Sequence, residues 1–209
     1  MTRYCFPDRK YASAGDFAGD YARQLNEAMA GVDRDQIDGV AGCLAAAIDA
    51  GREIFVCGNG GSSAIANHVT CDYVKLLGLA TGKPVRLSSL NAYSELNFAI
   101  ANDIAFEEVF AFHIAQRGRE GDVLWAISSS GSSPNIVKVL ETARAKGLET
   151  IAFTGFEGGK AKDIATHSVH VPAGNYGIVE DAHQMLAHIV CQYVRHLHVK
   201  EETLGSVVF

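Results

Sequence analysis

The sequence is poor in proline, in basic residues and in long apolar runs, and each shortage excludes a class of protein. Only 4 of the 209 residues are proline, against 21 glycines, which indicates many tight loops rather than a proline-rich linker. Lysine and arginine total 18, aspartate and glutamate 24, and the formal net charge is −6 at pH 7. General nucleic-acid binding is disfavoured, because affinity for a phosphate backbone needs a basic surface. A local basic pocket for one phosphate remains compatible with this charge.

Membrane and secretion signals are also missing. No apolar run approaches the roughly 18 residues that suggest a membrane-spanning helix, so no membrane partner is expected. Residues 1–30 carry four acidic side chains and no apolar core, so no signal peptide is expected. The cysteines are odd in number and lack metal-binding spacing, which favours reduced thiols in a cytoplasmic protein. They are Cys5, Cys43, Cys57, Cys71 and Cys191.

Short apolar runs alternate with segments of helical periodicity. Two amphipathic helices are predicted first, over 16–30 and 33–50, with Asp16 as the N-cap of the first. Strands are then predicted over 53–57, 85–88, 122–127, 150–153 and 168–171. Helices are predicted over 62–77, 94–100, 106–116, 134–146, 160–165 and 180–199. This alternation predicts an α/β fold, a three-layer α-β-α sandwich with a central parallel sheet. We expect an N-terminal arm (1–15) and a single domain (16–209).

The first candidate site is the loop Gly58-Asn59-Gly60-Gly61-Ser62-Ser63, between a predicted strand and a helix. Glycines let the backbone approach a ligand closely, and a helix N-terminus offers free N–H groups and the positive end of the dipole. Asn59, Gly60 and Ser62 are therefore candidates for binding an anion. The glycine spacing matches neither a P-loop nor a dinucleotide-binding fingerprint. The alternative is a plain turn and helix cap.

The second candidate is the loop Ser128–Ser133, again between a buried strand and a helix. Its five hydroxyls surround one glycine and can donate several hydrogen bonds without adding charge. This chemistry suits a phosphate monoester that must later be released, with Ser128, Ser129, Ser130 and Ser133 as candidate ligands. The alternative is a serine-rich helix cap, but two such loops at the ends of parallel strands favour a binding site.

Acidic residues and histidines recur on two of the predicted helices. His68 and Asp72 are spaced i, i+4, so they share a helix face and can bind a metal or place a base beside a substrate. On the last helix, Glu180 precedes His188, and His183 lies on a neighbouring face. As an alternative, His68 and Asp72 form only a hydrogen bond on the protein surface. For the last helix, the alternative is that its acidic residues only stabilise the helix N-terminus and its histidines are exposed to solvent.

Together these motifs resemble the sugar isomerase (SIS) domain over residues 16–200. Within it they resemble the phosphoheptose isomerase group, which converts sedoheptulose 7-phosphate to a heptose 7-phosphate. The motifs are the first glycine-serine loop, His68, the second serine loop, Phe153-Thr154-Gly155 with Gly158-Gly159-Lys160, and His188.

The resemblance implies roles for individual residues. Ser62, Ser128, Ser130 and Ser133 match phosphate-binding serines, and Asn59 matches a residue that lines the sugar. His68 matches a metal or site histidine, Asp72 stands where the group has its catalytic glutamate, and His188 matches the catalytic histidine. Glu180 stands where the group has a glutamine and is a candidate for binding the substrate. The resemblance also implies a homotetramer with its active sites between subunits.

The chain departs from the group at several positions. Asp72 is one methylene shorter than the expected glutamate, and a displacement of about 1 Å can cost a catalytic group roughly 10²-fold. Leu76 replaces an expected arginine, and Tyr93 and Gly177 replace expected aspartates. The phosphate loops are thus retained while several contacts to sugar hydroxyls are altered.

We expect an aldose–ketose isomerase of a phosphorylated sugar, of the heptose class, acting through an enediol. Asp72 would move the carbon proton and His188 the oxygen proton, and these two roles are exchangeable. A second hypothesis adds one zinc ion per site, held by His68, Asp72, Glu180 and His188, with no organic cofactor. The resemblance also leaves two alternatives. One is a non-catalytic sugar-phosphate-binding or regulatory protein, of the type that partners a replication initiator protein, and the other is a different reaction on a phosphorylated sugar.

Overall fold

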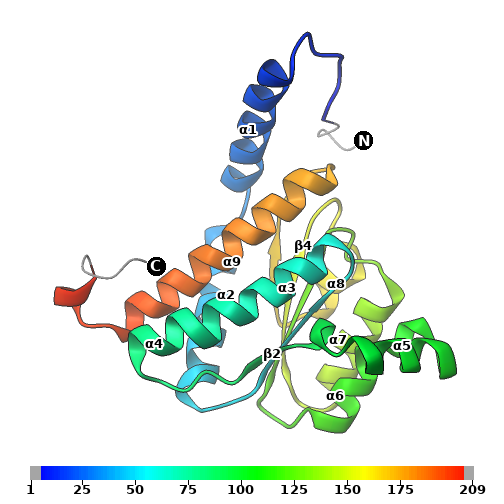
Figure 1. Cartoon of the computed structure of the whole chain (residues 1–209), viewed down its shortest axis with the longest axis vertical. Helices are drawn as coiled ribbons and strands as arrows, with labels where there is room; N and C mark the ends of the chain where they lie inside the picture. Colours follow the sequence, from blue (N-terminus) through cyan, green and yellow to red (C-terminus); the bar gives the residue numbers. More distant parts are fainter. Residues whose placement is uncertain (1–5, 205–209) are drawn as a thin grey trace.

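The computed structural model describes residues 6–204 and shows a three-layer α/β sandwich with a five-stranded parallel sheet (Figure 1). The predicted fold class is confirmed. The prediction of a reduced thiol at Cys5 lies outside the described residues, and the other four cysteines are free. Within the described part of the chain, no helix is both long and apolar enough to cross a membrane.

The sheet has the strand order β2-β1-β3-β4-β5, and every neighbouring pair is parallel. Because β1 lies between β2 and β3, the chain leaves β1 toward one edge of the sheet and later returns to its other side. In such sheets the crevice at the carboxyl ends of these central strands is the usual ligand site. The strands are β1 (Ile54–Gly58), β2 (Leu87–Ser89), β3 (Val123–Ser128), β4 (Glu149–Thr154) and β5 (His167–His170).

Side chains alternate between the two faces of the sheet and build two apolar cores. Val56 and Trp125 pack into one core with α2 and the C-terminal helix, whereas Phe55 and Leu124 face the other. The helices of the first core are α1 (Ala14–Ala30), α2 (Arg34–Asp49), α3 (Gly61–Cys71) and α9 (Tyr176–His198). Those of the second are α5 (Ser94–Asp103), α6 (Ala111–Arg117), α7 (Pro134–Ala145) and α8 (Gly159–Ile164). The short helix α4 (Gly78–Thr81) has no buried residue.

Several predicted helix boundaries were wrong. The helix expected over 62–77 is α-helical only to Cys71, and Asp72–Leu77 forms a π-helical segment before α4 begins. The last helix starts at Tyr176, four residues earlier than predicted, because the Asn175 side chain accepts a hydrogen bond from Ile178 N at 3.1 Å and caps it. Glu180 therefore lies in the second turn of α9 rather than at its start.

The N-terminal segment folds back along α1, which projects from the body of the molecule (Figure 1). The rings of Phe6, Tyr11, Phe17 and Tyr21 pack against one another with centroids 4.9–6.4 Å apart. Phe6 O also accepts a hydrogen bond from Asn175 Nδ2 at 2.8 Å. Residues 6–13 are thus held against α1 and α9 by these contacts.

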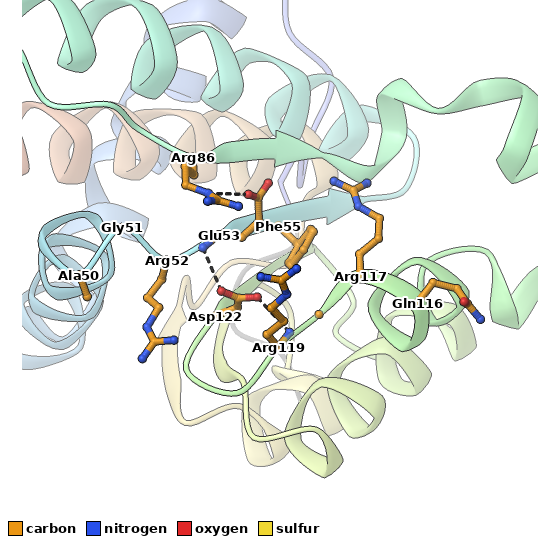
Figure 2. Close-up of a pocket in the computed structure, with 11 residues that line it drawn as sticks. Ala50, Gly51, Arg52, Glu53, Phe55, Arg86, Gln116, Arg117, Arg119 and Asp122 are labelled. Atoms are coloured by element: carbon orange, nitrogen blue, oxygen red, sulfur yellow. Dashed lines mark hydrogen bonds and ion pairs between the residues drawn. The ribbon is translucent and has the colours of Figure 1, made fainter.

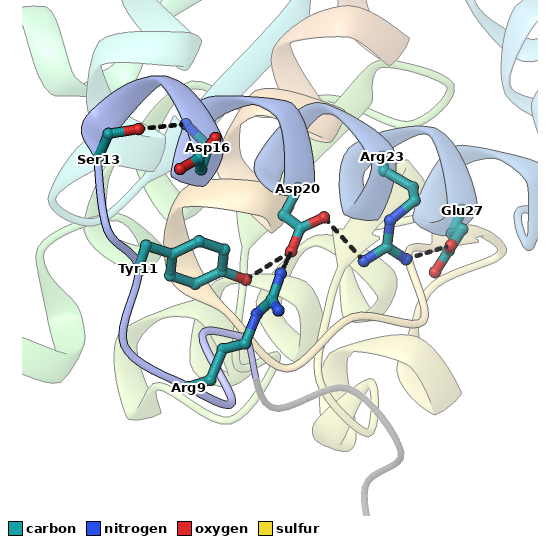
Figure 3. A network of polar contacts seen from close by, with 7 residues as sticks. All are labelled: Arg9, Tyr11, Ser13, Asp16, Asp20, Arg23 and Glu27. Carbon is teal, nitrogen blue, oxygen red and sulfur yellow. Dashed lines mark hydrogen bonds and ion pairs between the residues drawn. The ribbon is translucent and has the colours of Figure 1, made fainter.

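Polar contacts add to this attachment (Figure 3). Asp20 Oδ2 accepts hydrogen bonds from Tyr11 and Arg9, both at 2.8 Å, which lowers the pKa of Asp20. The N-cap of α1 is Ser13, whose hydroxyl accepts from Asp16 N at 3.1 Å, so the prediction of Asp16 as the N-cap was wrong.

Candidate functional site

The two predicted phosphate loops lie side by side, because the strands that precede them are paired. Gly58, the last residue of β1, is in register with Ile127 of β3. Asn59 in the first loop and Asn135 at the start of α7 exchange two amide hydrogen bonds, each of 2.8 Å. These bonds join the first loop to the helix that follows the second.

The first loop depends on close backbone packing. A Cβ atom on Gly58 would lie 2.6 Å from Ser62 O, so only glycine lets α3 begin this near β1. Asn91 completes the strand end by donating to Gly58 O at 2.8 Å and accepting from Gly58 N at 3.1 Å. Gly60 is exposed and has a φ of 54°, and Ser62 is buried, with an exposed fraction of 3%.

The serine loop is shaped by its own hydrogen bonds. Gly131 N donates to Ser128 Oγ at 3.1 Å, and Ser132 N donates to Ser130 Oγ at 3.3 Å. Gly131 has a φ of 61°, and a Cβ there would collide with Gly158 O, so this position requires glycine. Ser133 is the N-cap residue of α7.

Ser129 differs from its neighbours in the serine loop. Its carbonyl accepts from Gly155 N at 2.9 Å. Its hydroxyl is buried and has no hydrogen-bond partner among the described residues. Ser129 was predicted as a phosphate ligand like its neighbours, and in this structure its hydroxyl is covered by the protein.

Three of the four predicted metal ligands come together between α3 and α9, which run side by side (Figure 1). His68 Nε2 and His188 Nε2 are 2.9 Å apart, and each lies 3.3 Å from Asp72 Oδ2. The Asp72 side chain is 7% exposed, against 48% and 37% for the two histidines. We call His68, Asp72 and His188 the His-Asp-His group.

The spacing of this group requires a hydrogen atom or a cation between the two rings. Two imidazole nitrogens at 2.9 Å need either an N–H of one ring that donates to the other or a cation between them, since two lone pairs repel. The Asp72 carboxylate would attract a cation at this position. The group can therefore pass a proton to and from a substrate or hold a metal ion.

Glu180 lies outside the His-Asp-His group. Its carboxylate sits against Gly61, the first residue of α3, where a Cβ would lie 2.6 Å from Glu180 Oε1. Burial raises the pKa of Glu180, and the nearby charge of Asp181 raises it further. Glu180 is thus placed beside the first phosphate loop rather than with the other three predicted metal ligands.

Two departures from the expected sequence pattern have a local explanation. Gly177 makes room for Tyr21, because a Cβ at 177 would lie 2.9 Å from the Tyr21 hydroxyl. That hydroxyl donates to Asp181 Oδ2 at 2.6 Å and ties α1 to α9. Tyr93 follows β2, and its ring lies under the Arg117 guanidinium at 5.0 Å.

Sequence reasoning missed some polar residues at the site and misplaced one histidine. Gln184 Nε2 lies 3.0 Å from His188 Nε2, and the i, i+4 spacing of the two residues was the available signal. Asn91 and Asn135 gave no periodic signal. His183, for which solvation was the alternative interpretation, is fully buried, and this burial lowers its pKa to about 4 although a backbone contact with Thr154 opposes the shift.

Comparison with known proteins agrees with this geometry. The SIS domain family profile matches residues 19–155. The chain therefore belongs to the SIS domain family.

Within the family it is related to phosphoheptose isomerases. It is 34% identical over 157 residues to the phosphoheptose isomerase of Maridesulfovibrio salexigens, covering 75% of this chain and 76% of that protein. It is 35% identical over 158 residues to the one from Burkholderia pseudomallei, covering 75% and 79%. The solved phosphoheptose isomerase of Francisella tularensis superposes with a TM-score of 0.78 at 27% identity, over 88% of this chain and 99% of that one.

Proposed function

We propose that this protein is an aldose–ketose isomerase of a phosphorylated sugar of the heptose class. The observation that carries the proposal is the placement of the His-Asp-His group on the same helix pair as the first phosphate loop. Gly61 of α3 contacts Glu180 of α9, and His68 of α3 contacts His188 of α9. A ligand held by its phosphate at the first loop can therefore lie along both helices toward the group.

The loops supply hydrogen bonds for the phosphate. Backbone N–H groups at the N-terminus of α3 and the hydroxyls of Ser62, Ser128, Ser130 and Ser133 are the proposed donors. None of these groups adds a positive charge, which favours release of the product. Asn59, fixed by Asn135, would line the sugar.

The chemistry assigned to the group is a proton transfer between adjacent carbons. Asp72 takes a proton from the carbon next to the carbonyl, while His188 Nε2 gives a proton to the carbonyl oxygen, which forms the enediol. Asp72 then returns a proton to the neighbouring carbon, and His188 removes one from the other hydroxyl. These two roles are exchangeable, and His68 would hold the shared proton of the imidazole pair.

The donor set also fits a metal. Two imidazole nitrogens and one carboxylate form a three-ligand set of the kind that binds catalytic zinc with an open position. His68, Asp72 and His188 would hold the ion, and Glu180 would not be a ligand in the arrangement observed. A bound zinc would supply polarisation of the carbonyl oxygen.

We also infer a homo-oligomer, of the tetrameric kind that the resemblance implies. Large apolar side chains are exposed on the adjoining elements α9, α4 and the π-helical segment. They are Val74, Leu79, Ile189, Tyr193 and Leu197. Ile189, Tyr193 and Leu197 are four residues apart and share one face of α9, which supports its burial against another copy.

The decisive experiment is proton exchange in deuterium oxide, followed by NMR with sedoheptulose 7-phosphate in the presence and absence of zinc. The wild type should form product or exchange the proton next to the carbonyl. In the Asp72→Asn variant the rates of product formation and of proton exchange should both fall by at least 10²-fold. Binding of the sugar phosphate should be kept, because only the base is removed. Asp163→Asn, a change on α8 away from the group, is the control.

Other results would redirect the assignment. Binding of the sugar phosphate without exchange in the wild type would favour a binding or regulatory protein. Exchange with other phosphorylated sugars, but not with sedoheptulose 7-phosphate, would favour a different reaction at the same site. An Asp72→Asn protein with wild-type exchange would exclude Asp72 as the base.

A further inference from the structure

A cavity lies at the amino ends of β1 and β3, at the edge of the sheet opposite the two predicted phosphate loops (Figure 2). Its volume is about 510 Å³, and its lining includes Arg52, Arg86, Arg117 and Arg119. β1 separates it from the phosphate loops, and its five residues span roughly 17 Å at a rise of about 3.3 Å each. The cavity is therefore distinct from the proposed active site.

Arginine is concentrated in this cavity. Four of the ten arginines of the chain line it, although the whole protein has a formal net charge of −6. They come from three separate segments, since Arg52 precedes β1, Arg86 precedes β2, Arg117 is the last residue of α6, and Arg119 lies between α6 and β3. The fold thus gathers positive charge from distant parts of the sequence.

The two acidic residues of the cavity, Glu53 and Asp122, offset only half of the formal charge of the four arginines. Asp122 uses both carboxylate oxygens on backbone amides, accepting from Glu53 N at 3.0 Å and from Arg119 N at 2.9 Å. Glu53 forms an ion pair with Arg86 at 3.2 Å and accepts from Ser88. Asp122 therefore orders the backbone, and Glu53 pairs with only one of the four arginines.

Three guanidinium groups have no carboxylate within ion-pair distance in residues 6–204. Arg52 Nη1 donates to the carbonyl of Glu120 at 3.1 Å. Arg117 lies over the rings of Phe55 and Tyr93, at 5.2 and 5.0 Å. The guanidinium of Arg119 lies between Phe55 and Asp122 in Figure 2. Their remaining N–H groups are available to a ligand.

We propose that this cavity binds a diphosphate group, either as inorganic pyrophosphate or as part of a nucleotide. A guanidinium group offers planar, paired N–H donors that match phosphate oxygens, and such pairs are strong because both partners are charged. Guanidiniums that reach the cavity from three segments can each engage a different part of a ligand with two linked phosphates. The volume also exceeds what a single phosphate fills.

The test is titration calorimetry with inorganic pyrophosphate on the full chain. The wild type should bind it, and Arg52→Gln combined with Arg119→Gln should weaken the Kd at least tenfold. The matched control is Arg34→Gln with Arg144→Gln, which removes the same charge elsewhere. Arg144, like Arg52, donates to a backbone carbonyl, that of Ile164 at 3.1 Å. The control should bind within twofold of the wild type.

Three results would overturn the proposal. The first is that the wild type does not bind pyrophosphate at millimolar concentration. The second is that the control variant loses as much affinity as the cavity variant, which would show only general charge attraction. The third is orthophosphate binding as tightly as pyrophosphate, which would exclude a diphosphate site. ADP binding tighter than pyrophosphate would support a nucleotide ligand, and equal affinities would support the diphosphate alone.

A further variant separates this site from the proposed active site. Ser130→Ala with Ser133→Ala removes hydroxyls at the opposite edge of the sheet and should leave pyrophosphate binding unchanged. Loss of binding in that variant would place pyrophosphate in the serine loop and refute the proposal. This outcome does not depend on whether the protein is an isomerase.

Discussion

Glu180 is the residue that sets the charge beside the first phosphate loop. Its carboxylate lies against Gly61 at the N-terminus of α3, where the helix dipole attracts anions. An ionised carboxylate in this position repels a phosphate that approaches the same helix end. Under the proposed function, glutamate at this position therefore reduces affinity for the phosphate of the sugar.

Glu180→Gln is expected to tighten binding of a sugar phosphate several-fold at pH 8. The amide has a similar size and removes the negative charge. Because burial raises the pKa of Glu180, the wild-type side chain becomes neutral as the pH falls through this raised pKa. The affinities of wild type and variant should then converge toward acid pH, which calorimetry at several pH values measures.

Glu202→Gln is the control for this prediction, since Glu202 is exposed and lies after α9. Comparing ratios of affinity removes the titration of the phosphate itself, which both proteins share. An affinity ratio that stays constant from pH 8 to acid pH would contradict a role for the Glu180 charge.

Contacts between site residues were predictable from the sequence where both residues lie on the same helix. The i, i+4 rule brought His68 to Asp72, whereas the contact of His188 with this pair depends on the packing of α9 against α3. The position of Glu180 was not predictable in this way, because it depends on the packing of α9 against the start of α3. The burial of His183 likewise follows from which face of α9 meets the sheet.

At the scale of elements, the amide pair between Asn59 and Asn135 connects the first loop to α7. Asn135 is fully buried, and each side chain satisfies the other with two hydrogen bonds. Removing one partner leaves a buried amide unpaired, which costs about 1–3 kcal/mol.

Asn135→Ala should therefore lower the free energy of unfolding by this amount. Asn59→Ala should cost less when Asn135 is already alanine than in the wild type, because the shared bonds are gone. Chemical denaturation of the two single variants and the double variant measures the coupling. Additive effects would show that the pair contributes no coupling, and Asn102→Ala on the surface of α5 serves as the control.

Element types were predictable because burial on both faces gives continuous apolar strands and one-sided burial gives periodic helices. The π-helical segment over 72–77 was not, since its sequence keeps helical spacing and no glycine or proline marks the change. Such segments often occur at functional sites, and this one begins at Asp72. The early start of α9 was missed because its cap, Asn175, stands before residues with no clear periodicity.

At the scale of the whole molecule, the exposed apolar face of α9 gives the inferred assembly a specific test. Tyr193→Asp with Leu197→Asp should convert the oligomer to smaller species, because burying two carboxylates in an apolar interface is costly. Light scattering after gel filtration measures the mass. Phe98→Asp on α5 is the control, since Phe98 is 76% exposed but lies in the other helix layer.

A wild-type protein that is monomeric at micromolar concentration would refute the inferred assembly. An oligomer that persists in the double variant would show that the interface lies on another face of the protein. The overall layer order was predictable from the alternation of strands and helices, whereas the assembly was implied only by the resemblance, because a sequence does not show which apolar residues are left exposed.

The side-by-side placement of α3 and α9 fixes the distance between the first loop and the His-Asp-His group. Gly61 and His68 are seven residues apart, about 10 Å along the helix axis at 1.5 Å per residue. Under the proposed function, a sugar anchored by its terminal phosphate presents to His188 only the carbon atoms that lie at this distance. Shorter sugars stop before the His-Asp-His group and longer ones run past it. The number of carbon atoms, more than the orientation of any one hydroxyl, would then decide which phosphorylated sugars react.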